Sequence, residues 1–193
     1  MKQKDPHRQL EKLKNKVLGC TECPLHQERN LAVFGEGPWE SRIMVIGEGP
    51  GANEDKLGRP FVGRAGKLLD RMLEKQDLSR EKNVFIANIV KCRPPQNRVP
   101  HKKEVETCFP YLREQIRLIN PEIILLLGAT AMRSYWGSLD EKVSDIRGKW
   151  HREAGRLVMP TFHPAAVFRN RNYQEYIEQD LNTIAGKYRE LRR

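Results

Sequence analysis

The sequence predicts an α/β protein: a three-layer α/β/α sandwich with a central, mainly parallel sheet of four strands. Three observations point to this fold. Four short apolar blocks are rich in aliphatic and β-branched residues and are bounded by Gly, Pro or Asn, as strands commonly are. Their apolar residues are continuous instead of alternating, which is typical of strands covered by helices on both faces. Amphipathic stretches separate the blocks, and such alternation favours a parallel sheet.

The predicted elements follow one another along the chain. The four strands are expected at residues 42–48, 83–90, 122–128 and 156–161. Amphipathic helices are expected at residues 65–76, 101–119, 129–136 and 173–191, with Pro110 as a candidate kink in the second of these.

Two further segments flank this core. Residues 7–18 place Leu10, Leu13, Val17 and Leu18 on one side at helical spacing, which predicts an amphipathic N-terminal helix. Residues 149–161 are compatible with a hairpin that turns at Gly155, which would give the last strand a short neighbour.

Length and charge limit the classes of protein to which the chain can belong. A chain of 193 residues is expected to form one domain over residues 1–193. Subtracting 25 acidic from 35 basic residues gives a net charge of +10, which favours a polyanionic partner such as nucleic acid. The longest apolar runs are far shorter than the roughly 18 residues of a membrane span, and the N-terminus lacks the apolar core of a secretory signal. We therefore expect a cytoplasmic monomer without membrane contact.

Polar loops follow three of the predicted strands, at residues 47–63, 91–98 and 163–172. Functional groups of parallel α/β sheets collect on loops that leave the carboxyl ends of the strands. These three loops should therefore converge on one edge of the sheet.

The first loop is rich in Gly but matches neither common phosphate-binding pattern. Pro50 interrupts a G-x-G-x-x-G turn, and the next helix is expected only from about Arg64. A P-loop needs Lys and then Ser or Thr after its last Gly, whereas Arg64 and Ala65 follow Gly63. A dinucleotide site and an NTPase are therefore not expected.

The same loop carries the carboxylates of Glu48, Glu54 and Asp55. Carboxylates at the end of a buried strand need water, a cation or hydrogen-bond donors, and a positive charge that develops in a transition state would be such a partner. They are equally compatible with ordinary solvated loop residues. Phe61 in this loop would either stack on a base or fill the core.

The second loop concentrates positive charge, because residues 91–103 contain five basic residues and no acid. Such a loop is a natural phosphate clamp, although a merely solvated loop would have the same composition. The basic residues of this segment are Lys91, Arg93, Arg98, Lys102 and Lys103.

Asn88 ends the second predicted strand, and its amide offers the acceptor and donors needed to recognise a base edge. His163 begins the third loop, which ends in basic residues from Arg169 onward. A histidine after a strand is often structural, but its position opposite a carboxylate loop also suits a catalytic role.

Four cysteines are too few for a disulfide scaffold in a reducing compartment. Cys20 and Cys23 form a C-x2-C pair, and Cys92 and Cys108 follow much later. Four thiolates suit a tetrahedral zinc ion or a 4Fe-4S cluster. Spacing alone leaves both open, together with unrelated buried thiols.

Five segments in order resemble the family 4 uracil-DNA glycosylases, the iron-sulfur branch of their superfamily. They include GEGPGANEDKLGRPFVGRAG, NIVKCRPPQNR and HPAAVFRN, and the match runs from Cys20 to about Asn170. The resemblance implies an α/β/α sandwich and a 4Fe-4S cluster on Cys20, Cys23, Cys92 and Cys108. It also implies base excision repair of DNA that contains uracil, by hydrolysis of the N-glycosidic bond.

The resemblance also implies roles for individual residues. Uracil would contact Glu48, Gly49, Phe61, Asn88 and His163, and the catalytic residues would be Glu48, Glu54 and His163. The DNA backbone would be held by Lys91, Arg93, Arg98 and Arg169.

One segment departs from the family pattern, because VPHKKE follows Asn97 and Arg98 where the family has a more acidic or neutral stretch. His101 in this segment is similar to a histidine that links covalently to the uracil site in a related branch, but the basic insertion of that branch is missing. The alternative to an enzyme is an iron-sulfur or zinc module that only binds nucleic acid. A zinc deaminase is not expected, since no H-x-E with P-C-x-x-C pattern is present.

Overall fold

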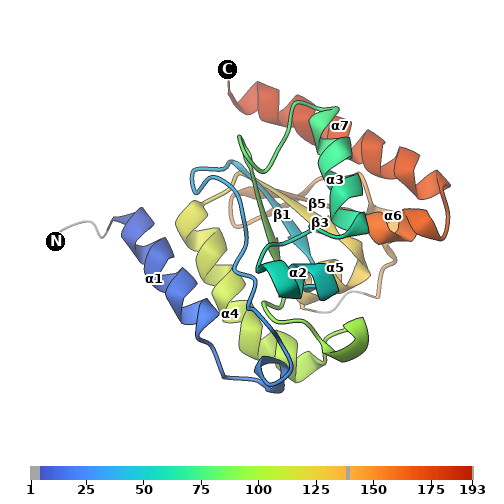
Figure 1. Cartoon of the computed structure of the whole chain (residues 1–193). Helices are drawn as coiled ribbons and strands as arrows, with labels where there is room; N and C mark the ends of the chain where they lie inside the picture. Colours follow the sequence, from blue (N-terminus) through green and yellow to red (C-terminus); the bar gives the residue numbers. More distant parts are fainter. Residues whose placement is uncertain (1–4, 138–139, 193) are drawn as a thin grey trace.

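A five-stranded sheet forms the centre of the computed structural model, which describes residues 5–137 and 140–192 (Figure 1). The strand order is β2-β1-β3-β5-β4, and β1, β2, β3 and β5 run parallel to one another. Every residue of β1, β2 and β3 is buried, which explains their continuous apolar sequences. The strands are β1 (Ile43–Gly47), β2 (Val84–Asn88), β3 (Ile123–Leu127), β4 (His151–Glu153) and β5 (Arg156–Thr161).

The predicted number of four strands is wrong by one. β4 pairs antiparallel with β5 through a turn at Ala154 and Gly155, where both residues have positive φ. The suggested hairpin over residues 149–161 is thus present. Its first strand, His-Arg-Glu, lies at the edge of the sheet and has no apolar residue. A search for apolar blocks in the sequence therefore does not find this strand.

The helices confirm the expected alternation and add short elements. α2 contradicts the expectation that no helix starts before Arg64; it has only six residues and ends at Gly58, whose φ is 68°. α4 runs through Pro110 as one continuous helix. The helices are α1 (Pro6–Leu18), α2 (Ala52–Leu57), α3 (Arg64–Glu74), α4 (Lys102–Ile119), α5 (Gly128–Trp136), α6 (Val143–Ile146) and α7 (Asn172–Leu191), with 3-10 turns η1 (Pro24–His26), η2 (Pro95–Asn97) and η3 (Pro164–Phe168).

Helices cover both faces of the sheet and complete the three predicted layers. α1 and α4 lie on one face, and α3 and α7 lie on the other (Figure 1). Alternate residues of one strand serve the two cores: Met44 and Ile46 pack toward α1 and α4, whereas Ile43 and Val45 pack toward α3 and α7. Within the described ranges, no helix has the length and hydropathy needed to cross a membrane.

Candidate uracil pocket and thiol cavity

A pocket of about 1180 Å³, its open mouth included, lies at the carboxyl edge of the parallel strands. The predicted convergence of the loops is therefore confirmed. Four chain segments bring the side chains that the sequence singled out, namely Glu48 and Gly49 after β1, Glu54 and Phe61 before α3, Arg98 after β2, and His163 and Arg169 after β5.

Phe61 is held in a conformation that is unusual for a side chain of its size. Its φ of 51° lies in the left-handed region, and its side chain is 6% exposed. The ring packs over Gly47, because a Cβ on Gly47 would fall 2.4 Å from Phe61 Cζ. Only glycine at position 47 leaves the space that the aromatic ring occupies.

Asn88 is the last residue of β2 and is 2% exposed. Its Oδ1 is buried and has no hydrogen-bond partner within residues 5–137 and 140–192. A Cβ on Gly47 would lie 2.6 Å from this oxygen, so the amide and the Phe61 ring meet over the same glycine. A buried acceptor without a partner is costly unless a ligand supplies the donor.

His163 follows β5 and lines the same pocket. The backbone N–H of Ala165 donates to Nδ1 at 3.1 Å, so the neutral ring carries its proton on Nε2. Burial lowers the pKa of His163 to about 4, and the nearby Glu54 opposes this shift only in part. The imidazole is therefore neutral at pH 7 and offers an Nε2–H donor.

The two candidate carboxylates differ in their partners. Glu54 Oε1 accepts hydrogen bonds from the backbone N–H of Val62 at 2.8 Å and of Gly63 at 2.7 Å. By contrast, no group in the described part of the chain hydrogen-bonds or ion-pairs with the Glu48 side chain, which is half-buried at the pocket. Glu54 thus anchors the loop that leads into α3, and Glu48 remains available to a ligand or water.

The four candidate phosphate ligands do not behave alike. Arg169 is exposed at the pocket, and Arg93 is partly exposed and donates to Asn97 Oδ1 at 2.8 Å. Arg98 also lines the pocket, where it forms two hydrogen bonds of 2.7 and 2.8 Å with the buried Glu104 carboxylate. Glu104 was outside the segment counted as purely basic, so the positive charge of this region is lower than the sequence count indicated.

Lys91 corrects one prediction. Its side chain is 1% exposed, and Nζ donates to Asn88 O and Gln115 Oε1, both at 2.7 Å. Burial lowers the pKa of Lys91 to about 8. A phosphate of bound DNA cannot reach this amine, so the prediction that Lys91 contacts the DNA backbone is wrong.

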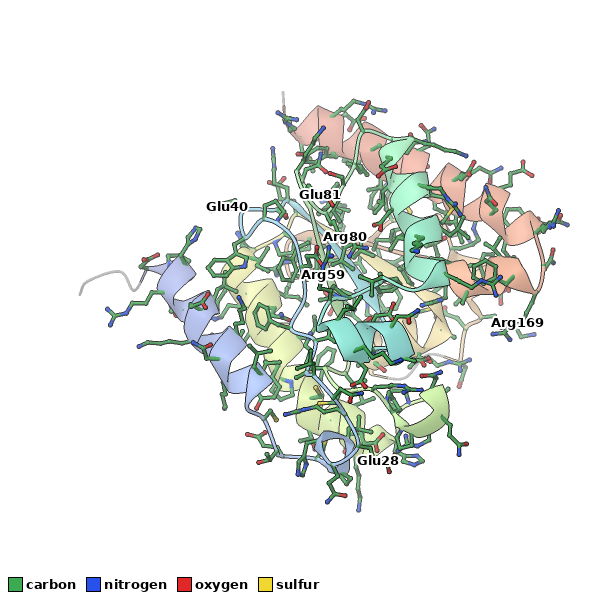
Figure 2. All side chains as sticks on the ribbon, viewed as in Figure 1. Glu28, Glu40, Arg59, Arg80, Glu81 and Arg169 are labelled. Carbon is green, nitrogen blue, oxygen red and sulfur yellow. The ribbon has the colours of Figure 1, made fainter. Side chains whose placement is uncertain are left out.

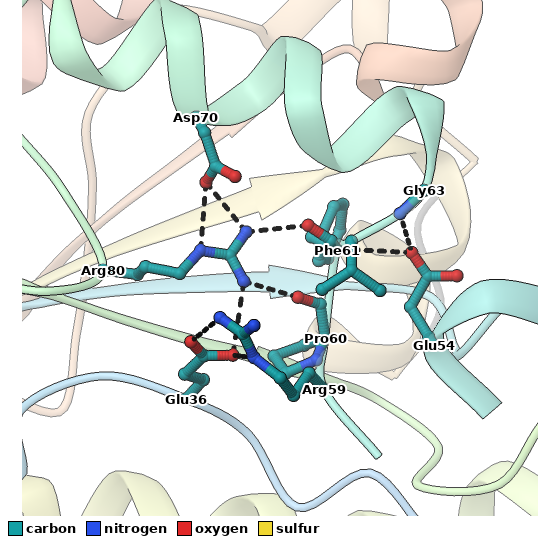
Figure 3. A network of polar contacts seen from close by, with 9 residues as sticks. Glu36, Glu54, Arg59, Pro60, Phe61, Gly63, Asp70 and Arg80 are labelled. Carbon is teal, nitrogen blue, oxygen red and sulfur yellow. Dashed lines mark hydrogen bonds and ion pairs between the residues drawn. The ribbon is translucent and has the colours of Figure 1, made fainter. Parts of the chain in front are cut away.

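Sequence reasoning missed two contributors to the site. The junction of β3 and α5 lines the pocket with Leu127, Gly128, Ala129 and Thr130, and the rule of carboxyl ends would have found it if applied to the third strand as well. Arg80 was also missed. It lies between α3 and β2 and hydrogen-bonds to the backbone of Pro60 and Phe61 (Figure 3).

The four cysteines line one cavity, whose empty space is about 300 Å³ with its opening included, and all four are free thiols. Cys20 and Cys23 come from the segment after α1, Cys92 from the loop after β2, and Cys108 from α4. Arg29 forms part of the same wall. Cysteines that lie far apart in the sequence therefore line one cavity.

Hydrogen-bond donors point at three of the sulfur atoms. Arg29 Nη1 donates to Cys92 Sγ at 2.9 Å, the Lys91 backbone N–H to Cys108 Sγ at 3.2 Å, and Tyr111 OH to Cys20 Sγ at 3.3 Å. Burial raises the pKa of the Cys108 thiol to about 12, so the cavity favours neutral thiols unless a cationic group enters it.

Among residues 5–137 and 140–192, no three His, Cys, Asp or Glu side chains are grouped closely enough to ligate one ion. The four thiols instead line one shared cavity.

Comparisons with known proteins agree with this fold and pocket. A family model described as "Uracil DNA glycosylase superfamily" matches residues 34–184, which include the whole sheet and the pocket. The class of protein is therefore that superfamily.

Curated relatives narrow the class. A type-4 uracil-DNA glycosylase of Sulfurisphaera tokodaii is 47% identical over 183 residues, which cover 91% of this chain and 83% of the relative. One of Thermotoga maritima is 46% identical, covering 84% of this chain and 85% of the relative. A type-5 enzyme of Pyrobaculum aerophilum is only 28% identical, over 79% of this chain and 81% of the relative. The chain belongs to the type-4 uracil-DNA glycosylase family.

Proposed function

We propose that the protein is a DNA repair glycosylase that removes uracil from DNA and leaves an abasic site. One observation carries this proposal: Phe61 and the neutral donor His163 line one pocket, and the buried Asn88 amide meets the Phe61 ring over Gly47, with an Oδ1 that has no partner among the described residues. These are the groups needed to hold a flat base by its face and its polar edge. The net charge of +10 supports a polyanionic substrate.

Uracil would be bound after the nucleotide is flipped out of the base stack, at a cost of a few kcal/mol. Phe61 would stack on the base. Asn88 Oδ1 would accept the N3–H of uracil, and Asn88 Nδ2 would donate to O4. This pairing would satisfy the acceptor that is left without a partner in the described chain. Backbone groups of Glu48 and Gly49 would complete the pocket.

Hydrolysis would break the bond between sugar C1′ and uracil N1. Negative charge would collect on the departing uracil, where the Nε2–H of His163 would donate to O2. Positive charge would develop on the sugar, which a carboxylate stabilises while water adds to C1′ and gives its proton to the products. The neutral state of His163 supports this role, since a donor that keeps its proton stabilises the leaving base without adding charge to the pocket in the ground state.

We assign the catalytic carboxylate to Glu48, because Glu54 Oε1 already accepts from Val62 and Gly63. Glu54 would shape the pocket wall near C5 of the base, where the methyl group of thymine must be refused. Phosphates of the DNA would be held by Arg93, Arg98 and Arg169, and Lys91 is withdrawn from this set.

We propose that the thiol cavity holds a 4Fe-4S cluster on Cys20, Cys23, Cys92 and Cys108. The fit is supported by four free thiols around one space and by Arg29, which offers positive charge to a cluster of thiolates. When bound, the cluster would cross-link the segment after α1 to α4. Lys91 would connect this region to the pocket, since its backbone N–H contacts Cys108 and its amine contacts Asn88 O.

Incubation with a uracil-containing oligonucleotide tests the function. Release of free uracil, with strand cleavage at the site after alkali, is expected, and the matching thymine oligonucleotide is the control. Binding without release would support the alternative, a nucleic-acid-binding module without catalysis.

The cofactor has a separate test. Protein purified without oxygen should be brown and contain about four irons per chain. A colourless protein with one zinc would overturn the cluster assignment.

A further inference from the structure

We propose that Arg80 is a positioning residue of the uracil pocket: its guanidinium holds the backbone of Pro60 and Phe61, so that the Phe61 ring stays where a flipped base would stack. This inference rests on the proposed function.

Arg80 is a buried charge whose hydrogen-bonding capacity is used completely. Its side chain is 4% exposed, and it comes from the turn between α3 and β2 (Figure 2). Nη1 donates to Pro60 O at 2.6 Å and to Glu36 Oε2 at 3.5 Å. Nη2 donates to Phe61 O at 2.8 Å and to Asp70 Oδ1 at 2.8 Å, and Nε donates to the same Asp70 oxygen at 3.0 Å. All five N–H groups therefore have a partner.

The charges around Arg80 hold it in this position. Asp70 on α3 and Glu36 flank the guanidinium, and Arg59 pairs with Glu36 from the solvent side at 2.6 Å (Figure 3). A buried arginine with two carboxylates and two carbonyls is fixed far more firmly than an exposed one. The guanidinium can therefore serve as a rigid support for the segment that it contacts.

The segment needs such a support because Phe61 is strained. A non-glycine residue at a φ of 51° keeps that conformation only if its surroundings enforce it. Arg80 binds the carbonyls of Pro60 and Phe61, and Glu54 binds the next two backbone N–H groups, those of Val62 and Gly63 (Figure 3). Four consecutive residues are thus clamped by two side chains of opposite charge.

Lysine cannot replace this support. An ammonium has three donors at one point, whereas the observed contacts need a planar fork that reaches two carbonyls and one carboxylate at once. In Arg80→Lys the charge is kept, but at least one of the two carbonyls loses its donor. Phe61 can then relax toward negative φ, and its ring leaves the wall of the pocket.

The test compares Arg80→Lys with wild type in single-turnover excision of uracil and in inhibition by free uracil. We expect a loss of tenfold or more in both the excision rate and the affinity for free uracil. Affinity for uracil-free DNA should change less than twofold. Arg42→Lys is the matched control: Arg42 also binds one carboxylate by two bonds, that of Glu122, and one carbonyl, that of Leu191, but at the opposite end of the sheet.

A double-mutant cycle with Phe61→Ala shows whether Arg80 acts through Phe61. If it does, adding Arg80→Lys to Phe61→Ala lowers the excision rate no further. Should Arg80→Lys fail to fold, Asp70→Asn, which weakens the anchoring of the same guanidinium, replaces it in the cycle, with a smaller loss in the same direction.

The outcomes separate the two proposals. Independent, multiplicative effects of the two substitutions, or an Arg80→Lys variant that behaves like Arg42→Lys, would overturn the role of Arg80 while wild type still releases uracil. A wild-type protein that releases no uracil would overturn the proposed function itself.

Discussion

The rings of Phe61 and His163 lie 5.7 Å apart between centroids and are tilted by 31°. The Phe61 ring and the His163 imidazole therefore belong to one wall of the pocket. Burial of the His163 ring is the main cause of its lowered pKa.

Acid should destabilise the protein in part through His163. The unfolded chain binds a proton with a pKa of about 6.5, whereas the folded protein does so only at about 4. Between these values unfolding takes up a proton, so stability from this group is present above pH 6.5 and is lost as the pH falls. Lowering the pH from 7 to 5 should cost about 1 to 2 kcal/mol more in wild type than in His163→Gln. Urea unfolding of both proteins at the two pH values measures this difference, and equal losses would contradict the shifted pKa.

Asn88→Ala should remove most uracil excision, by about 100-fold or more, because the pocket loses both its acceptor and its donor for the base edge. Stability should hardly fall, since Oδ1 has no partner among the residues that the structure describes. Excision kinetics and thermal unfolding test the two halves of this prediction. Affinity for DNA should stay near the wild-type value, and unchanged excision would refute the role of the amide.

Gly47→Ala should displace, with one methyl group, both of the side chains for which we propose contact with uracil, Phe61 and Asn88. The new Cβ would fall 2.4 Å from Phe61 Cζ and 2.6 Å from Asn88 Oδ1, so both must move. We expect a loss of stability of about 1 to 3 kcal/mol and an excision rate reduced at least tenfold. Gly186→Ala in α7 is the control. A Cβ there meets nothing within 4 Å, and alanine should stabilise the helix by up to about 1 kcal/mol.

The two carboxylates should separate in their effects on stability. Glu54→Gln should lower both stability and excision, because its carboxylate accepts two backbone N–H groups of the clamped loop. Glu48→Gln should lower the rate of the chemical step and leave the thermal midpoint within a degree or two, since its carboxylate supports no other described group. Full turnover in Glu48→Gln would move the catalytic role to Glu54 or to no carboxylate at all.

Much of the fold follows from apolar continuity in the sequence. β1, β2, β3 and β5 were predictable because burial on both faces demands runs such as IILLL. β4 could not be found in this way, because an edge strand of three polar residues needs no apolar face, and only the turn expected at Gly155 suggested it. α2 was missed because six residues between glycines are too short for a periodic pattern, although Gly58 at the C-terminus of the helix was a usable signal.

Candidate site residues could be predicted where their position at the end of a strand placed them at the sheet edge. They could not be predicted where contacts with distant parts of the chain decide whether a side chain is buried. Asn88 and His163 follow directly from their positions at strand ends. Lys91 was misassigned because its side chain points into the protein. There its amine donates a hydrogen bond to the Gln115 side chain of α4, a contact that the local sequence does not reveal. Arg80 gave no signal, because its importance comes from two carbonyl groups 19 and 20 residues earlier in the chain.

The pocket takes residues from the loops after all four parallel strands, from Glu48 to Arg169. A shift of any strand by one residue would turn its side chains to the opposite face and remove part of the site. When the protein refolds after dilution from denaturant, only molecules in which every strand has regained its register would therefore release uracil. Catalysis would then lag behind the return of helical circular dichroism, which partly ordered chains already display.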